Sequence, residues 1–140
     1  MSVEVQFAMP RRGLPSPAAL RSWAMGASGV TLRIVGAREG RALNKKYRGK
    51  GNPTNVLSFP YGDGRGDVVL CHPVVAREAR AQGKSVAAHY AHLVVHGILH
   101  LRGYDHEKKR DALRMEAREV RLLRRLGFPD PYAVKSASRR

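Results

Sequence analysis

Histidine spacing is the feature of this 140-residue sequence that most constrains its local fold. Five of the six histidines fall within a stretch of 18 residues, namely His89, His92, His96, His100 and His106. With about 3.6 residues per turn, the first four share one sector of a helix that Ser85 caps and that runs through Leu101. Gly103 then permits the positive φ that ends a helix. The spacing therefore predicts a histidine stripe followed by a return of the chain that brings His106 back toward it.

Three of these histidines are the expected metal ligands. His96 and His100 stand one helical turn apart, close enough to share an ion, and His106 follows the turn as a third imidazole. Three neutral imidazoles leave one position of a tetrahedral ion open, which is typical of catalytic sites. One divalent ion per chain is expected, with Zn2+ as the default and Ni2+ or Cu2+ also compatible. A hydrogen-bonded structural role is the favoured interpretation for His72, His89 and His92.

The ligand spacing reproduces the frame of the metzincin zinc proteases, with one departure. Those enzymes carry a general-base glutamate directly after the first histidine, where this chain has Gly97. A metalloprotease stays as an alternative only if another carboxylate replaces that base. A water molecule on the metal, with its pKa lowered to roughly 7, needs less help from a base. Hydrolysis of a phosphodiester is therefore open, and it calls for a nearby arginine to neutralise the developing charge.

Charge and composition narrow the class of protein further. The chain has 26 Lys and Arg against 11 Asp and Glu, and its net charge of +15 lies almost entirely in residues 1–50 and 102–140. Such charge fits the attraction of a nucleic acid, although an arginine-rich proteome would produce the same composition. The single Cys71 excludes an internal disulfide, and neither a signal peptide nor an apolar run of about 20 residues is present. A cytoplasmic protein without a membrane span is expected.

Alternating patterns along the chain predict one α/β domain over 1–132 and a basic tail over 133–140. Strands are expected at 3–7, 31–34, 56–59 and 67–72, with a Gly-rich loop from Tyr61 to Arg65 between the last two. Helices are expected at 18–25, 38–47, 73–82, 85–101 and 107–126. The apolar face predicted for the last helix consists of Leu113, Ala117, Val120, Leu123 and Leu126. This order predicts a four-stranded mixed sheet packed with about five helices.

Several blocks of the sequence resemble one known family, the YbeY endoribonucleases. The segment HGILHLRGYDH, from His96 to His106, is similar to the family signature HGxLHLxGYDH. Four further blocks resemble family blocks, and they read LNKKYR, PTNVLSFP, GDV and DPY, beginning at Leu43, Pro53, Gly66 and Asp130. The resemblance covers most of residues 38–132, so it rests on much more than one motif.

The resemblance implies a single-strand-specific, metal-dependent endoribonuclease. Its implied roles are maturation of the 3′ end of small-subunit (16S) ribosomal RNA and ribosome quality control. The small ribosomal subunit and an assembly GTPase are the implied partners. A second interpretation, from another class, is a ribosome-assembly factor whose metal is structural and whose basic surface binds RNA without cutting it. The implied metal ligands are His96, His100 and His106, and His96 also counts as a catalytic residue.

Arg48 matches the arginine of the family's basic cleft, so the resemblance implies a catalytic and RNA-binding role for it. The neighbouring cations expected to contact RNA are Lys45, Lys46 and Lys50. Asp67 and Asp105 are candidates for orienting a ligand histidine, with capping of a backbone turn as the alternative for each. The chain departs from the family at Arg65, which replaces an apolar residue, and in its short loop before that position. These departures bear on RNA preference and not on the metal ligands.

Overall fold

The computed structural model describes residues 3–49, 54–104 and 108–133. Within these ranges, four strands and five helices follow one another in the predicted order. The strands are β1 (Val3–Phe7), β2 (Val30–Val35), β3 (Val56–Gly62) and β4 (Arg65–Cys71). The helices are α1 (Pro17–Trp23), α2 (Ala37–Arg48), α3 (His72–Gln82), α4 (Val86–Leu101) and α5 (Lys109–Arg125). The prediction of an α/β fold on a four-stranded mixed sheet is confirmed.

The sheet has the strand order β1-β2-β4-β3, which makes β3 an edge strand. β1 and β4 both run parallel to β2, whereas β3 runs antiparallel to β4. The loop expected from Tyr61 to Arg65 is shorter than predicted, because both strands extend into it. Only Asp63 and Gly64 form the turn, with φ of 57° and 78°. Asp-Gly is a favoured sequence for the type I′ hairpin turn, which needs positive φ at both positions.

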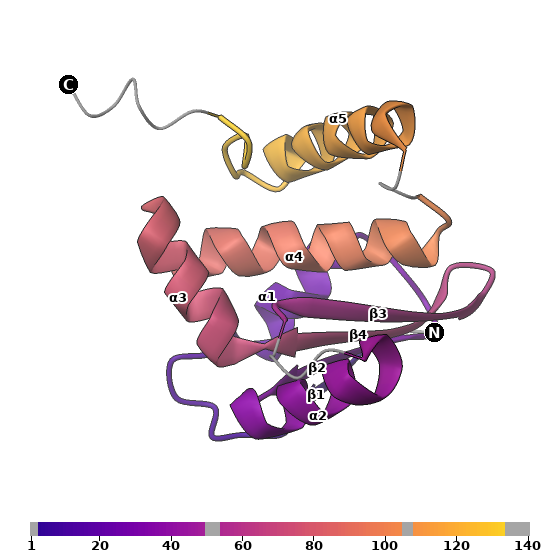
Figure 1. Ribbon diagram of the computed structural model, residues 1–140. Helices are drawn as coiled ribbons and strands as arrows, with labels where there is room; N and C mark the ends of the chain where they lie inside the picture. The colour runs from indigo at the N-terminus through magenta and orange to yellow at the C-terminus, as the bar shows by residue number, and fades with distance from the viewer. Residues whose placement is uncertain (1–2, 50–53, 105–107, 134–140) are drawn as a thin grey trace.

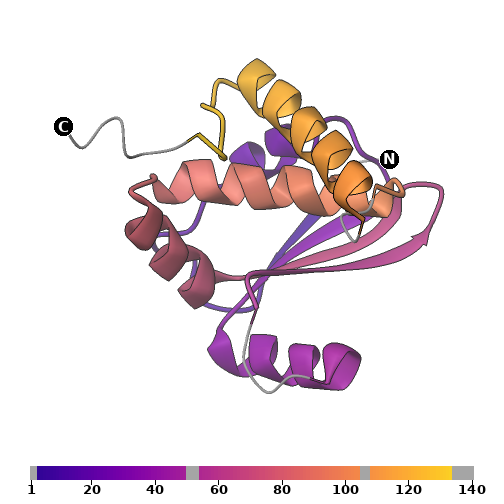
Figure 2. The same ribbon diagram turned by 45° about the horizontal axis from the view of Figure 1, so that its top comes forward.

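Helices cover both faces of this sheet (Figure 1). α2 lies on one face above a small apolar cluster of Val35, Leu57, Val69, Cys71 and Val74. α1 and α4 lie on the other face, over the main core. α5 packs on the outside of α4 and crosses it, as Figure 2 shows. The histidine helix is therefore enclosed between the sheet and α5, and this position explains why ten of its 16 residues are buried.

Both predicted ends of α4 are present. The Ser85 hydroxyl accepts a hydrogen bond from the Ala88 N–H at 3.0 Å, which caps the first turn. Gly103 has a φ of 95° and turns the chain away after the last turn. Caps and helical periodicity are local properties of the chain, so this element could be read from the sequence before any tertiary contact was known.

At Gly97, α4 packs tightly on the sheet. A β-carbon added there would lie 2.7 Å from Val68 Cγ1 on β4 and 3.3 Å from Ser58 Oγ on β3. The position at which metzincins carry their glutamate therefore faces a packed sheet in this fold. A glutamate there would push α4 off the sheet, so the geometry argues against the metalloprotease alternative.

Replacing Gly97 by alanine is expected to destabilise the protein. Alanine in a helix interior is normally about 1 kcal/mol more favourable than glycine. Here the added methyl overlaps Val68, and overpacking typically costs about 1–3 kcal/mol. We expect a net loss of up to about 2 kcal/mol in the free energy of unfolding, measured from the urea midpoint. The control is Ala87→Gly at an exposed position of α4, which measures helix propensity alone. A Gly97→Ala protein more stable than the parent would contradict the close approach of α4 to Val68.

Candidate metal centre

Along the histidine stripe of α4, the distance between neighbouring rings is shortest for one pair. Ring centroids are 6.3 Å apart between His92 and His96, but only 4.7 Å apart between His96 and His100. These last two rings line a cavity of about 270 Å³, together with Thr54, Asn55, Val56, Ser58 and Pro60. The structure thus brings two of the three predicted ligands to one cavity beside the edge strand β3. His106 and Asp105 lie outside the described residues.

Glu119 of α5 is the functional residue that the sequence interpretation missed. Its side chain is fully buried, and its Oε2 is hydrogen-bonded to His96 Nδ1. Its Oε1 accepts a hydrogen bond from the Tyr132 hydroxyl and lies 3.4 Å from His92 Nε2. One carboxylate therefore joins α4, α5 and the segment after α5. The signal in the sequence was its spacing from two apolar residues of the same helix, Met115 and Leu122.

The predicted apolar face of α5 is wrong for two residues. Leu113 is 60% exposed and Ala117 is exposed, whereas the side chains turned toward α4 are those of Met115, Glu119, Leu122 and Leu123. The helix is rotated relative to the prediction because a glutamate occupies the centre of its buried face. A hydropathy pattern counts such a residue as outward-facing, although hydrogen bonds make its burial favourable here.

Hydrogen bonding keeps the Glu119 carboxylate ionised. Burial by itself would raise the pKa of Glu119, but hydrogen bonds from His92, His96 and Tyr132, with the charge of His96, lower it to about 2. The pKa of the Tyr132 phenol is raised by burial and by the adjacent Glu119 carboxylate. At neutral pH the phenol is therefore a donor and the carboxylate an acceptor, which is the arrangement that fixes the His96 ring.

The described residues include a set with the chemistry to hold a metal ion. His92, His96 and Glu119 each offer a ligand atom, and these atoms lie within 4.8 Å of one another. Imidazole and carboxylate are ordinary zinc ligands. Glu119 and His96 Nδ1 are nevertheless in direct hydrogen-bond contact, closer than the roughly 3.3 Å between two ligands of one tetrahedral ion. Glu119 thus acts in this geometry as a hydrogen-bond partner of His96.

The other histidines take part in hydrogen bonds of their own. His72 Nδ1 lies 2.7 Å from the Tyr90 hydroxyl, and His89 Nε2 lies 2.8 Å from Glu78 Oε1. Burial lowers the pKa of both imidazoles, which favours their neutral forms. Glu78 also accepts from Asn55 Nδ2 at 3.0 Å, so the buried His89 helps to position a residue that lines the cavity.

Three of the four predicted RNA-binding cations lie at the C-terminal end of α2. Lys45 and Lys46 are exposed on the last turns of α2, and Arg48 is the last residue of that helix. Lys50 lies outside the described residues. α2 covers the sheet face opposite α4 (Figure 1), and Tyr47 of this helix packs against Phe59 of β3 with ring centroids 5.0 Å apart. The contact of Arg48 with a substrate stays a prediction.

Asp67 lies on the face of the sheet that α2 covers. In the strand register it stands opposite Phe59, and the alternate positions on β4, Val69 and Cys71, belong to the cluster beneath α2. Its carboxylate accepts a hydrogen bond from the Tyr61 hydroxyl. Within the described part of the chain, its hydrogen bonds connect it to no histidine. The predicted orienting role therefore has no contact to support it.

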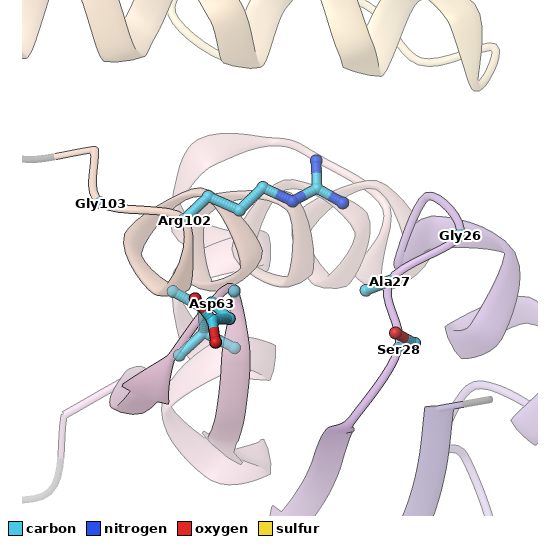
Figure 3. A pocket seen from close by; sticks show the side chains of 8 residues that line it. Gly26, Ala27, Ser28, Asp63, Arg102 and Gly103 are labelled. Atoms are coloured by element: carbon cyan, nitrogen blue, oxygen red, sulfur yellow. The ribbon is translucent and has the colours of Figure 1, made fainter. Parts of the chain in front are cut away.

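A larger cavity lies at the C-terminal end of α4 (Figure 3). Its volume is about 630 Å³, and its walls are the loop before β2, the hairpin turn and the end of α4. The Arg102 side chain extends along α4 and away from Asp63 (Figure 3). Among the residues that the structure describes, no histidine, cysteine or glutamate lines this cavity.

The protein has a geometry that is found in one class of enzyme. It is an α/β protein with two imidazoles in one open cavity, one of them held by a buried carboxylate, as is typical of metal-dependent hydrolases. The family model described as Endoribonuclease YbeY matches residues 18–127. The chain belongs to this family, which places it among hydrolytic endoribonucleases and confirms the resemblance found in the sequence.

Individual relatives agree with this assignment. A protein of Nitrosomonas eutropha named Endoribonuclease YbeY is 48% identical over 138 residues, covering 94% of this chain and 98% of the relative. One of the same name from Aromatoleum aromaticum is 53% identical over 126 residues, covering 85% and 82%. The solution structure of TM1509 from Thermotoga maritima has a TM-score of 0.58 at 23% identity, covering 94% and 99%, and supports the fold. None of the helices in the described ranges has the length and apolar character that a membrane crossing requires.

Proposed function

We propose that this protein is a metal-dependent endoribonuclease that cuts single-stranded RNA at the cavity between α4 and β3. Its substrate in the cell is ribosomal RNA, and it matures the 3′ end of the 16S molecule. It also acts in ribosome quality control. Its partners are the small ribosomal subunit and an assembly GTPase. The observation that carries the enzymatic part is His96, which shares a cavity with His100 while the buried Glu119 holds its Nδ1. A carboxylate behind a ligand histidine is the usual support of a metal centre.

His96 and His100 hold the ion in this proposal, with His106 as the third ligand by its place in the family signature. Because Glu119 engages Nδ1 of His96, Nε2 is the atom of that ring assigned to the metal. Zn2+ is the proposed ion, with Ni2+ as the alternative. When bound, such an ion supplies Lewis acidity that activates water and neutralises charge on a phosphoryl oxygen.

The chain's own residues orient the site. Glu119 accepts the Nδ1 proton of His96, so it selects the tautomer with a lone pair on Nε2 and restrains rotation of the ring. Tyr132 donates to the same carboxylate and keeps it in place from the far side. Gly97, by its close packing on β4, sets the depth of the histidine pair over the edge strand.

Substrate binding is assigned to the side of β3 that α2 flanks. Arg48, Lys45 and Lys46 attract the phosphate backbone toward the edge strand, with Arg48 engaging a phosphate next to the cut bond. Tyr47 and Tyr61 are 55% and 65% exposed, so their rings are accessible to unstacked bases. Stacking on exposed rings favours single strands, since the bases of a duplex are already stacked.

Removal of the metal is expected to abolish cleavage reversibly. Metal content and cutting of a labelled single-stranded RNA are measured on one sample of the parent, its chelated form, and that form after addition of Zn2+ or Ni2+. We expect about one equivalent of metal per chain, as for a single three-ligand site. Cleavage that survives complete chelation would refute metal dependence. A loaded protein that cuts no RNA would favour the assembly-factor interpretation.

A further inference from the structure

α5 carries a row of arginines along its outer surface. Projected at about 3.6 residues per turn, five exposed arginines fall in one sector roughly 100° wide. They are Arg110, Arg114, Arg121, Arg124 and Arg125, and we call them the arginine stripe. At about 1.5 Å per residue the stripe extends for roughly 22 Å along the helix. The acidic residues of α5 all project outside this sector, and they are Asp111, Glu116 and Glu119.

The stripe faces away from the rest of the molecule. The opposite side of α5 packs on α4 through buried residues such as Met115 and Leu123. In both views α5 is the outermost layer beyond α4, on the side away from the sheet (Figures 1 and 2). The ion pairs formed among the described residues join other groups, and none includes an arginine of the stripe. The five charges are therefore presented to an external partner.

Helix stability accounts only for the last-turn members of the stripe, Arg124 and Arg125, which favour the helix C-terminus. Arg110 and Arg114 stand at i and i+4, as do Arg121 and Arg125, and like charges at this spacing destabilise a helix. A polyanion bound along the stripe would relieve this repulsion. The planar guanidinium group suits phosphate in particular, because it can donate two parallel hydrogen bonds to two oxygens.

The arrangement favours RNA over a membrane. A basic helix that binds a bilayer inserts its apolar face, and the apolar face of α5 is already buried on α4. Leu113 is the exposed large hydrophobic residue on this helix, and one such side chain does not make an inserting face. A row of arginines with one acidic residue, Asp111, at its N-terminal end matches the regularly spaced phosphates of a nucleic acid backbone.

We propose that the arginine stripe is a second RNA-binding surface, separate from the cleavage cavity. It binds the phosphate backbone of a structured RNA segment while an adjoining single strand enters the cavity between α4 and β3. The choice of RNA as ligand rests on the proposed function. The location of the surface rests on the five arginines alone, since Glu119 lies on the opposite side of α5, where it meets His92 and His96 of α4.

The test is a triple variant, Arg114→Gln/Arg121→Gln/Arg124→Gln, in the full chain. Glutamine keeps helix propensity close to that of arginine, and Arg125 stays to interact with the helix C-terminus. Binding of a labelled RNA stem-loop with a single-stranded extension is followed by stopped-flow anisotropy, before cleavage, at several KCl concentrations. We expect affinity to fall about tenfold or more and the slope of log affinity against log salt to become shallower by about 2–3. Cleavage of a short single-stranded oligonucleotide is expected to stay within roughly twofold of the parent.

The matched control removes the same charge elsewhere, in Arg12→Gln/Arg77→Gln/Arg80→Gln, from three exposed positions outside α5. An equal loss of stem-loop binding in the two triple variants would overturn the stripe, because total charge would explain it. The proposal would also be overturned if the stripe bound phosphatidylserine vesicles or polyglutamate more strongly than RNA. A parent that binds the stem-loop through the stripe but cuts no RNA supports the surface and refutes the proposed function. If the parent cuts the short strand but the stripe variant keeps the parent's affinity for the stem-loop, the proposed function is supported and the stripe is refuted as an RNA-binding surface.

Discussion

Replacing His96 by alanine is expected to abolish RNA cleavage in a protein that stays folded. The variant loses the one imidazole that both lines the cavity with His100 and is held by Glu119. Outer partners of metal ligands typically contribute about 10- to 100-fold to affinity or activity, and loss of the ligand itself is expected to exceed that. The fold should survive because the His96 side chain is 23% exposed and the apolar residues of α4 are unchanged.

The measurement combines circular dichroism, metal content and cleavage of single-stranded RNA on the same sample. His72→Ala is the matched control, since His72 lies outside the cavity and is hydrogen-bonded to Tyr90. It should keep both metal and cleavage. A folded His96→Ala protein that still cuts RNA would remove His96 from the reaction. An unfolded one would indicate that the metal is structural, as the assembly-factor interpretation requires.

Glu119→Gln is expected to lower metal affinity by about 10- to 100-fold while cleavage falls in parallel. Glutamine has the same shape, but it carries one acceptor oxygen and an amide that only donates. In the parent, both carboxylate oxygens accept hydrogen bonds, from His96 on one side and Tyr132 on the other. The amide NH2 group would face either His96 or Tyr132. In the first case the His96 ring loses its restraint, and in the second case the Tyr132 hydroxyl loses its acceptor. Competition with a coloured chelator measures the affinity without relying on activity.

The free energy of unfolding of the metal-free protein tests the contribution of the Glu119 carboxylate independently of metal binding. An unsatisfied buried polar group costs about 1–3 kcal/mol, so the metal-free Glu119→Gln protein should unfold at lower urea. The pKa of Glu119 is lowered from 4.5 to about 2, so its ionised form stabilises the fold above pH 4.5. That stabilisation is lost as the pH falls from 4.5 toward 2, and the two proteins should converge there. Equal stability at neutral pH would show that the hydrogen bonds of Glu119 contribute nothing.

The sequence was a good guide wherever the determining interactions are local. Strand alternation, the Ser85 cap and the turn at Gly103 all act within a few residues, and the elements they predict are present. Helical spacing also placed His96 beside His100, because neighbours at i and i+4 share one face of any helix. The hairpin was predicted as a loop since its strands extend beyond the apolar pattern. Pairing between β3 and β4, and not side-chain polarity, extends them to Gly62 and Arg65.

Contacts distant in the sequence could not be predicted in this way. The side of the sheet on which Asp67 lies follows from strand register, and a shift of one residue would reverse it. The rotation of α5 depends on its packing against α4. The hydropathy pattern placed Leu113 on the buried face and did not include Glu119, whereas in the packed helix Leu113 is 60% exposed and Glu119 is fully buried.

The sequence by itself determined the order of the elements, the histidine stripe and the family, because these depend on local periodicity and on matching blocks. Only the tertiary structure decided what supports His96. Residues 96 and 119 belong to different helices, and docking of α5 on α4 brings the carboxylate to the ring. Burial of that charge is favourable only because three donors converge on it, two from α4 and one from the segment after α5, and no pattern along one helix predicts this convergence.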